Sequence, residues 1–149
     1  MQTNRRKFLK SVGAASVGVS LYPTIVKASA LGLNGHISPS DKINTILIGC
    51  GGMGRANLNG FLEFENVQAV AVCDVDENQS DIAKKMVDEK YGNTDCRVYS
   101  DFREILEKEK VDAAILALPD HWHAIIAIAV ANKGIDIYGE KPLARSIVE

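Results

Sequence analysis

The chain has 149 residues, with 24% charged and 46% hydrophobic side chains and a formal net charge of −2. This length allows one domain of about 100–150 residues. Lys and Arg number 17 against 19 Asp and Glu, so the chain lacks the basic excess of a nucleic-acid-binding protein. We therefore expect small molecules, and no nucleic acid, as partners.

The first thirty residues have the pattern of an export signal. A basic opening with the pair Arg5-Arg6 precedes a mildly apolar run over residues 11–26, and Ala28-Ser29-Ala30 has the small-x-small pattern of a cleavage site. The paired arginines favour the twin-arginine (Tat) route over an ordinary secretory signal or an uncleaved anchor. Glycines, serines and Pro23 make the run a poor membrane span. We predict a Tat-type signal over residues 1–30, the Tat export machinery as a partner, and a periplasmic or extracytoplasmic location.

The remainder of the chain is acidic and begins with a linker. Without residues 1–30 the chain has 12 Lys and Arg against 19 Asp and Glu, a net charge of −7. Residues 31–41 are rich in Gly, Asn, Ser and Pro, which is typical of a linker. The cysteines, Cys50, Cys73 and Cys96, are odd in number and scattered, so we interpret them as small buried apolar residues and not as a disulfide framework.

From residue 42 to residue 149, short apolar segments alternate with amphipathic ones. The pattern predicts strands over residues 43–48, 67–73, 97–99, 111–118 and 135–138. It predicts helices over 54–63, 76–90 and 121–133, and another beginning at Ser100. In the helix over 76–90 the inward residues are expected to be Ile82, Ala83, Met86 and Val87. Such alternation is typical of an α/β fold, a doubly wound parallel sheet of the Rossmann type, which binds ligands beyond the carboxyl ends of its strands.

The first strand ends in the pattern Gly49-x-Gly51-x-x-Gly54. Gly49 permits a tight turn, Gly51 leaves the backbone open to a pyrophosphate, and Gly54 lets the helix pack close to the strand. The phosphates would then lie on the free N–H groups at the start of that helix. An acidic residue, Asp74, follows Gly54 by twenty residues, at the end of the second strand. The sequence therefore favours a dinucleotide site over the alternative, a glycine turn with only a structural role. Gly52 and Met53 lie in the same turn and are also candidate cofactor-binding residues.

Asp74 is placed to accept hydrogen bonds from the adenosine ribose. Its negative charge repels the extra phosphate of NADP, so we expect NAD as the cofactor. The alternative is that Asp74 only caps the next helix, but Asp76 is better placed as that N-cap.

The segment Pro119-Asp120-His121-Trp122-His123 follows the fourth strand. Residues two apart on a helix point in different directions, which argues against a metal site on the two histidines. We expect Asp120 to be the N-cap of a helix, and both imidazoles and the indole to face the cofactor. Trp122 would cover the nicotinamide or stack on a sugar ring. Pro119, His121, Trp122 and His123 are thus candidate cofactor-binding residues.

Lys141 is the candidate catalytic residue. Pro142 disfavours the helical region for Lys141, so Glu140 and Lys141 would lie in an extended segment and point to opposite sides. A partly desolvated lysine near a cationic nicotinamide would have a lowered pKa suited to proton transfer. The alternative, favoured when spacing alone is considered, is a surface Glu-Lys pair before a turn.

Four motifs together resemble the glucose–fructose oxidoreductase, inositol dehydrogenase and rhizopine-catabolism family (Gfo/Idh/MocA): the glycine turn, Cys73-Asp74-Val75-Asp76, residues 119–124, and Gly139-Glu140-Lys141-Pro142-Leu143-Ala144. The resemblance covers about residues 42–149 and implies an NAD(P)-binding Rossmann domain. It implies Glu140 near the nicotinamide ribose and Lys141 assisting proton transfer at a sugar hydroxyl. It also implies a second α/β domain with most of the sugar contacts, which this chain lacks, and a homo-oligomer at full length. Where the family has an Asn-x-x-His-type turn, this chain has Asp120.

Of three candidate functions, we expect the first, and the other two stay open as alternatives. The first is an NAD-dependent oxidoreductase that acts on a sugar hydroxyl and, because an exported protein has no ready NAD pool, keeps and recycles its cofactor. The second is an NAD-dependent glycosidase that oxidises, eliminates and reduces back, because the Asp-His-Trp-His turn resembles that of alpha-N-acetylgalactosaminidases. The third is a sugar- or nucleotide-sensing domain without turnover. We expect this piece alone to be inactive.

Overall fold

The computed structural model describes residue 32 and residues 37–148. The signal predicted for residues 1–30 and most of the predicted linker lie outside these residues. Residues 39–149 form one unit by their internal contacts. Its elements are η3 (Pro39–Asp41), β1 (Ile43–Ile48), α2 (Gly52–Phe61), β2 (Val67–Cys73), α3 (Glu77–Tyr91), β3 (Arg97–Tyr99), α4 (Phe102–Lys108), β4 (Ala113–Leu116), α5 (Asp120–Asn132) and β5 (Asp136–Gly139).

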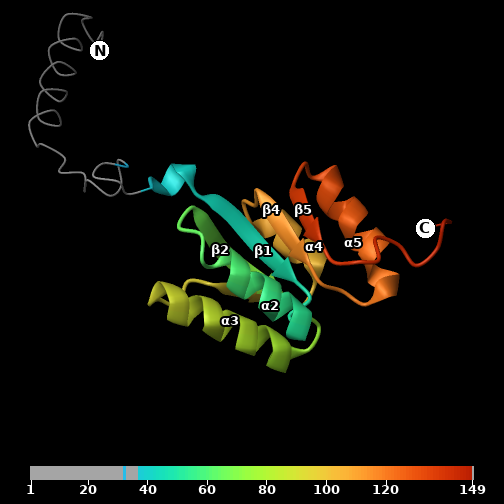
Figure 1. Cartoon of the computed structure of the whole chain (residues 1–149), viewed down its shortest axis with the longest axis horizontal. Helices are drawn as coiled ribbons and strands as arrows, with labels where there is room; N and C mark the ends of the chain where they lie inside the picture. The colour runs from blue at the N-terminus through green and yellow to red at the C-terminus, as the bar shows by residue number, and fades with distance from the viewer. Residues whose placement is uncertain (1–31, 33–36, 149) are drawn as a thin grey trace, which may run out of the picture. The chain divides into compact units, whose positions relative to one another are not determined.

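The strands form one five-stranded sheet in the order β3-β2-β1-β4-β5 (Figure 1). Each neighbouring pair is parallel. From β1 the chain moves outward to β2 and β3, then returns to place β4 on the other side of β1. The strand order therefore reverses at β1, which is where doubly wound sheets bind ligands. The predicted fold class is confirmed.

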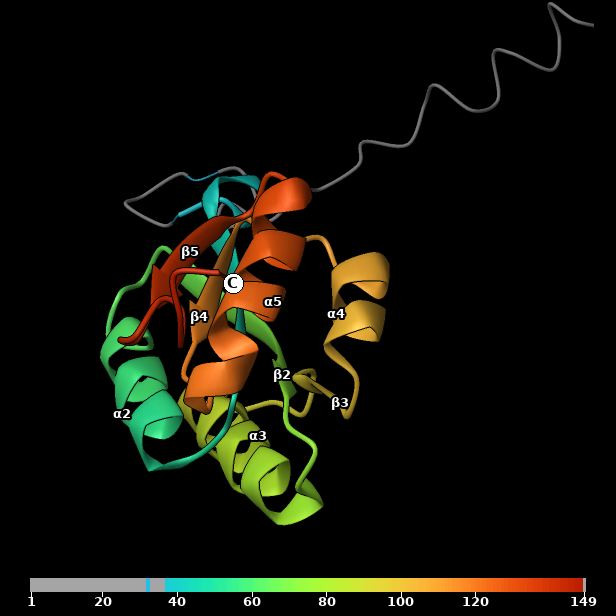
Figure 2. The ribbon, with the colours of Figure 1, turned by 90° about the vertical axis from the view of Figure 1, so that its right-hand side faces the viewer.

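Helices cover both faces of the sheet, as the turned view in Figure 2 shows. Alternate side chains of a strand point to opposite faces. Ile46 and Ile48 of β1 belong to one core cluster, which α4 and α5 complete with Ile105 and Ile126. Leu47 belongs to the other cluster, which includes Leu58, Leu62, Ala83 and Val87 of the α2 and α3 side. A strand buried on both faces needs a nearly continuous apolar run, which explains the run over β1 and β2.

Four expectations about the helices are corrected. α4 begins at Phe102, with Asp101 as its N-cap, and not at Ser100. α2 begins at Gly52 and not at Gly54, so the last three residues of the motif, 52–54, lie in its first turn. α5 begins at Asp120, with Pro119 as the N-cap residue and no side-chain cap. Ile82 is not inward, since 47% of it is exposed on α3. Among the described residues, no helix combines the length and apolarity needed to cross a bilayer.

Candidate functional site

The turn between β1 and α2 requires glycine at two positions for packing reasons. Gly49 has a φ of +92°, and a Cβ there would lie 2.2 Å from the carbonyl oxygen of Ala117. A Cβ on Gly54 would lie 1.9 Å from the carbonyl oxygen of Gly49. Both contacts are with backbone, which cannot move aside as a flexible side chain can. These glycines therefore fix the turn against the end of β4 and hold the helix close to β1.

Gly51 differs from them, because a Cβ there would meet nothing within 4 Å. Its backbone is extended, with a φ of −62° and a ψ of −175°, and it is the N-cap of α2 without a side-chain cap hydrogen bond. The first N–H groups of a helix have no partner within the helix and attract anions. The open space beside Gly51 and this uncapped helix start together fit a phosphate group, so the turn suits the pyrophosphate of a dinucleotide.

Asp74 is fixed against the glycine turn by its carboxylate. Oδ2 accepts a 2.7 Å hydrogen bond from the N–H of Cys50, and Oδ1 accepts one of 3.0 Å from the N–H of Asp76. Asp76 in turn caps α3, since its side chain accepts from the N–H of Asn78, as expected. The two carboxylates thus have separate structural tasks, and the charge of Asp74 lies at the edge of the glycine turn.

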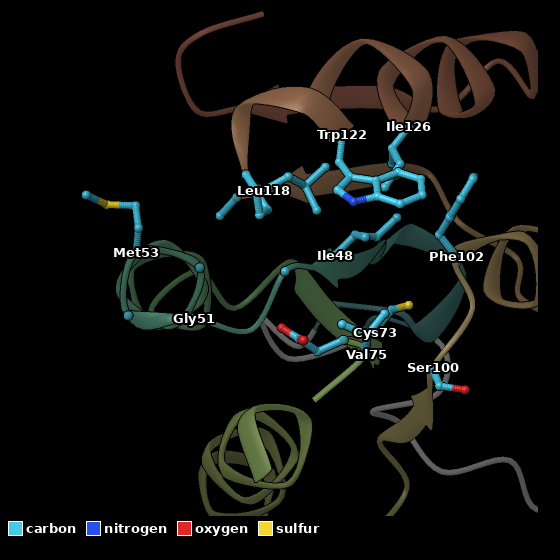
Figure 3. A pocket seen from close by; sticks show the side chains of 16 residues that line it. Ile48, Gly51, Met53, Cys73, Val75, Ser100, Phe102, Leu118, Trp122 and Ile126 are labelled. Atoms are coloured by element: carbon cyan, nitrogen blue, oxygen red, sulfur yellow. The ribbon is translucent and has the colours of Figure 1, made fainter. Parts of the chain in front are cut away.

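A pocket of about 470 Å³ lies above the carboxyl ends of the strands. Its lining comes from the ends of the strands and the segments that follow them, and from α2, α4 and α5, as Figure 3 shows for the labelled side chains. Of the predicted cofactor-binding residues, it includes Gly49, Gly51, Gly52, Met53, Gly54, Asp74, Pro119 and Trp122. The structure therefore brings three of the four predicted clusters to one cavity.

The sequence interpretation missed one side of this pocket. Ser100 and Phe102 follow β3, and Leu118 and Ile126 lie at and after the end of β4. The Phe102 and Trp122 rings meet edge-on, with centroids 6.4 Å apart. The signal was available, since Ser100 and Phe102 also follow the carboxyl end of a strand. Together these side chains give the pocket an apolar, aromatic wall that suits a flat ring.

His123 does not face this pocket, which corrects the expectation for its imidazole. Only 2% of His123 is exposed. Its Nε2 lies 2.8 Å from the carbonyl oxygen of Leu118 and 3.3 Å from the backbone N of Leu118. The side chain is therefore buried against the backbone of the β4–α5 turn. His121 is exposed and does not line the pocket, so its predicted cofactor contact stays a prediction.

Glu140 and Lys141 follow β5 and lie outside the pocket lining. Glu140 continues the sheet, since its N–H donates a 2.9 Å hydrogen bond to the carbonyl oxygen of Leu116. Its carboxylate accepts a 2.9 Å hydrogen bond from Nδ2 of Asn57 on α2. Lys141 is exposed, and the peptide bond between Lys141 and Pro142 is cis. The sequence offered no signal for Asn57, because its partner is 83 residues away.

The cysteines are buried and free, as expected. Burial, with the nearby Asp74 carboxylate as a smaller cause, raises the pKa of Cys50 to about 12 and that of Cys73 to about 12. Burial raises the pKa of Cys96 to about 11. Protonated thiols are poor nucleophiles and poor metal ligands. Among the described residues, no group of three His, Cys, Asp or Glu side chains could hold a metal ion.

Comparison with known proteins agrees with this geometry. The model of the Gfo/Idh/MocA oxidoreductase family, described as an NAD-binding Rossmann fold, matches residues 43–149. The chain belongs to this family. The match covers every strand of the sheet and all four motifs, so the NAD-binding domain of the family is the part of it that this chain contains.

Sequence relatives of this chain include glycosidases. The chain is 28% identical over its whole length to an alpha-N-acetylgalactosaminidase of Tannerella forsythia and covers 35% of that protein. It is 29% identical over 98% of its length to a glycosyl hydrolase family 109 protein of Shewanella baltica, again covering 35% of it. The chain thus spans about a third of the length of the curated relatives it matches.

Solved structures of dehydrogenases share the fold. Myo-inositol 2-dehydrogenase of Lactobacillus plantarum has a TM-score of 0.63 and 25% identity over 72% of this chain and 30% of the other. The WlbA dehydrogenase of Bordetella pertussis, solved with NADH and UDP-GlcNAcA, has a TM-score of 0.57 and 28% identity over 69% of this chain and 30% of the other. This chain is thus similar to glycosidases in sequence and to dehydrogenases in fold.

Proposed function

We propose that the whole protein is an NAD-dependent oxidoreductase acting on a sugar or sugar-derivative hydroxyl by hydride transfer, with its cofactor kept bound and recycled. The observation that carries the proposal is the glycine turn, whose open N-terminal helix end lies next to the anchored carboxylate of Asp74. This arrangement provides an anion site and a ribose acceptor at the reversal of strand order.

The order of the strands gives each motif a place along a dinucleotide. Asp74 follows β2, on one side of β1, whereas Glu140 and Lys141 follow β5, two strands away on the other side. With strands about 4.8 Å apart, a pyrophosphate at the end of β1 would have one ribose towards Asp74 and the other towards Glu140. NAD, when bound, supplies the hydride acceptor. Lys141 would take the proton of the substrate hydroxyl at Nζ and later return it.

A second function has support of its own. The glycosidase relatives match this chain over 98–100% of its length. An oxidation, an elimination of the glycosidic substituent, an addition of water to the resulting double bond and a reduction would give the free sugar and leave the cofactor unchanged overall, which suits a protein that keeps its NAD. Both functions use the same cofactor domain, so the substrate contacts of the complete protein decide between them.

One experiment tests the proposal and separates the two functions. Mass spectrometry of ligand released from the purified complete protein should identify NAD, and the protein should then be screened against sugars and glycosides. Oxidoreduction gives an oxidised sugar together with a reduced partner, whereas the glycosidase gives a free sugar and no change in NAD. Release of no nucleotide, together with no binding of added NAD, would contradict both.

Asp74 is expected to make the chain prefer NAD to NADP. Asp74→Asn keeps an oxygen that can accept from the N–H of Cys50 but removes the negative charge. The dissociation constants for NAD and NADP should then differ by no more than about threefold, because repulsion of the 2′-phosphate of NADP is lost. Titration of the purified chain with each cofactor measures this. Tighter binding of NADP by the unaltered chain would contradict the assignment.

Trp122 is expected to contribute to binding of the adenine ring. Although it follows β4, it lines the same pocket as Asp74 and Val75, and its ring meets that of Phe102, which follows β3. Trp122→Ala should weaken binding of ADP and of NAD alike, by ~10-fold, because base–aromatic stacking contributes about 1–3 kcal/mol. Trp122→Phe, which keeps a ring, is the control. A loss for NAD without a loss for ADP would instead place the indole over the nicotinamide.

We also propose that the protein is exported through the Tat route to the periplasm or outside the cytoplasm, on the strength of Arg5-Arg6. Replacing both arginines with lysine keeps the positive charge but removes the paired guanidinium groups, so export should stop. Cell fractionation measures the distribution. Unchanged export of the double variant would indicate the general secretory route.

A further inference from the structure

Two contacts join α2, the helix of the glycine turn, to the end of β5. Asn57 donates its hydrogen bond to Oε1 of Glu140, and the ring of Phe61 meets that of Tyr138 edge-on with centroids 5.1 Å apart. Phe61 follows Asn57 by four residues on α2, and Tyr138 of β5 precedes Glu140, the residue after the strand, by two. Asn57 and Phe61 therefore lie on one face of α2, and Tyr138 and Glu140 lie on one face of the β5 segment. The motif glutamate is thus held from the same helix whose start forms the anion site.

The position of this bond along α2 sets where the carboxylate lies. Asn57 is five residues after Gly52, the first residue of α2, which is ~7.5 Å along the axis at 1.5 Å per residue. Glu140 therefore lies beside the second turn of α2, one turn after the phosphate-binding end of the helix. Asp74 lies on the other side of the turn in the order of the strands.

The chemistry of the donor matters as much as its position. An amide N–H fixes a carboxylate oxygen without cancelling the negative charge, whereas Lys or Arg in its place would pair with that charge. The bond uses Oε1, and the carboxylate has a second oxygen that can accept from a hydroxyl group. Both residues are partly buried, so the side chains have restricted freedom.

From this geometry we infer that Asn57 is a positioning residue, which orients the Glu140 carboxylate to accept hydrogen bonds from the second ribose of the dinucleotide, the one on the β5 side. This inference rests on the proposed binding of NAD and adds a residue that none of the four motifs contains. Asn57 acts through Glu140 and touches neither the reacting atoms nor the substrate.

Comparison of ADP with ADP-ribose tests the inference, because only ADP-ribose carries the second ribose. Asn57→Ala in the 149-residue chain should weaken ADP-ribose binding ~3- to 10-fold, the range for one lost hydrogen bond, and leave ADP binding within about twofold. In a Glu140→Ala background, Asn57→Ala should cause no further loss, because the carboxylate it orients is gone. Isothermal titration measures the dissociation constant of each ligand for four proteins: the unaltered chain, the two single variants and the double variant.

Phe61→Leu is the matched control, since it loosens the second contact between the same two elements without touching Glu140. It should lower the melting temperature while the ratio of ADP to ADP-ribose affinity stays unchanged. If Asn57 only tied α2 to β5, both variants would behave alike. Equal losses for the two ligands, or a full loss that persists in the Glu140→Ala background, would overturn the inference. If the unaltered chain bound neither ligand, the proposed function would fall as well, which is a different result.

Discussion

Replacing Lys141 with alanine in the complete protein is expected to lower kcat by ~10²–10⁴, the usual contribution of a positioned acid or base. Binding of NAD should change little, because Lys141 is exposed after β5 and lies outside the pocket around the glycine turn. The physical reason is that Nζ would hold the proton of the substrate hydroxyl while the hydride moves. Cofactor titration and steady-state kinetics on the substrate found by screening measure the two effects separately.

Two further variants make the Lys141 result specific. Lys141→Arg keeps the charge but should not restore turnover, because a guanidinium does not release its proton near neutral pH. Lys133→Ala removes another exposed lysine, at the end of α5, and should leave kcat unchanged. Near-normal kcat for Lys141→Ala would show that Lys141 takes no part in catalysis and belongs to a surface Glu-Lys pair. A loss of NAD binding alone would make it a cofactor contact.

Gly54→Ala is expected to destabilise the fold by on the order of 3 kcal/mol, because overpacking against rigid backbone is costly. The added Cβ would lie 1.9 Å from the carbonyl oxygen of Gly49, and the turn that carries this oxygen is itself pressed against Ala117. Neither side can yield without shifting α2 or β4. Thermal denaturation should show a melting temperature lower by on the order of 10 °C.

Gly51→Ala is the matched comparison within the same motif. Its φ of −62° is normal for alanine, and its Cβ would point into open space. Stability should therefore change by about 1 kcal/mol or less, the range for a helix N-cap substitution. NAD affinity should fall by at least ~10-fold, because the methyl group would occupy the path of the pyrophosphate to the backbone. Equal destabilisation by both variants would show that Gly51 is also a packing glycine.

Much of the fold could be predicted because it depends on local patterns. The apolar runs of β1 and β2 gave both ends of each strand correctly, since a strand buried on both faces requires such a run. Gly134 ends α5 with a φ of +73°, as expected of a glycine after a helix. Helix starts were less accurate: the glycines of the turn suggested a start at Gly54, whereas the backbone becomes helical at Gly52.

The sequence alone also determined which residues are chemically suited to a dinucleotide, because the glycine spacing and the acid after β2 are features of one short segment each. What it could not determine is which side chains bond to one another across the sheet. The partners of Asp74 and Glu140, the backbone of Cys50 and the amide of Asn57, are 24 and 83 residues away. His123 shows the same limit at short range, since only the turn of the chain at Leu118 decides that its imidazole is buried against the backbone and away from the pocket. Strand order and register bring such groups together, and they are set by packing of the whole sheet.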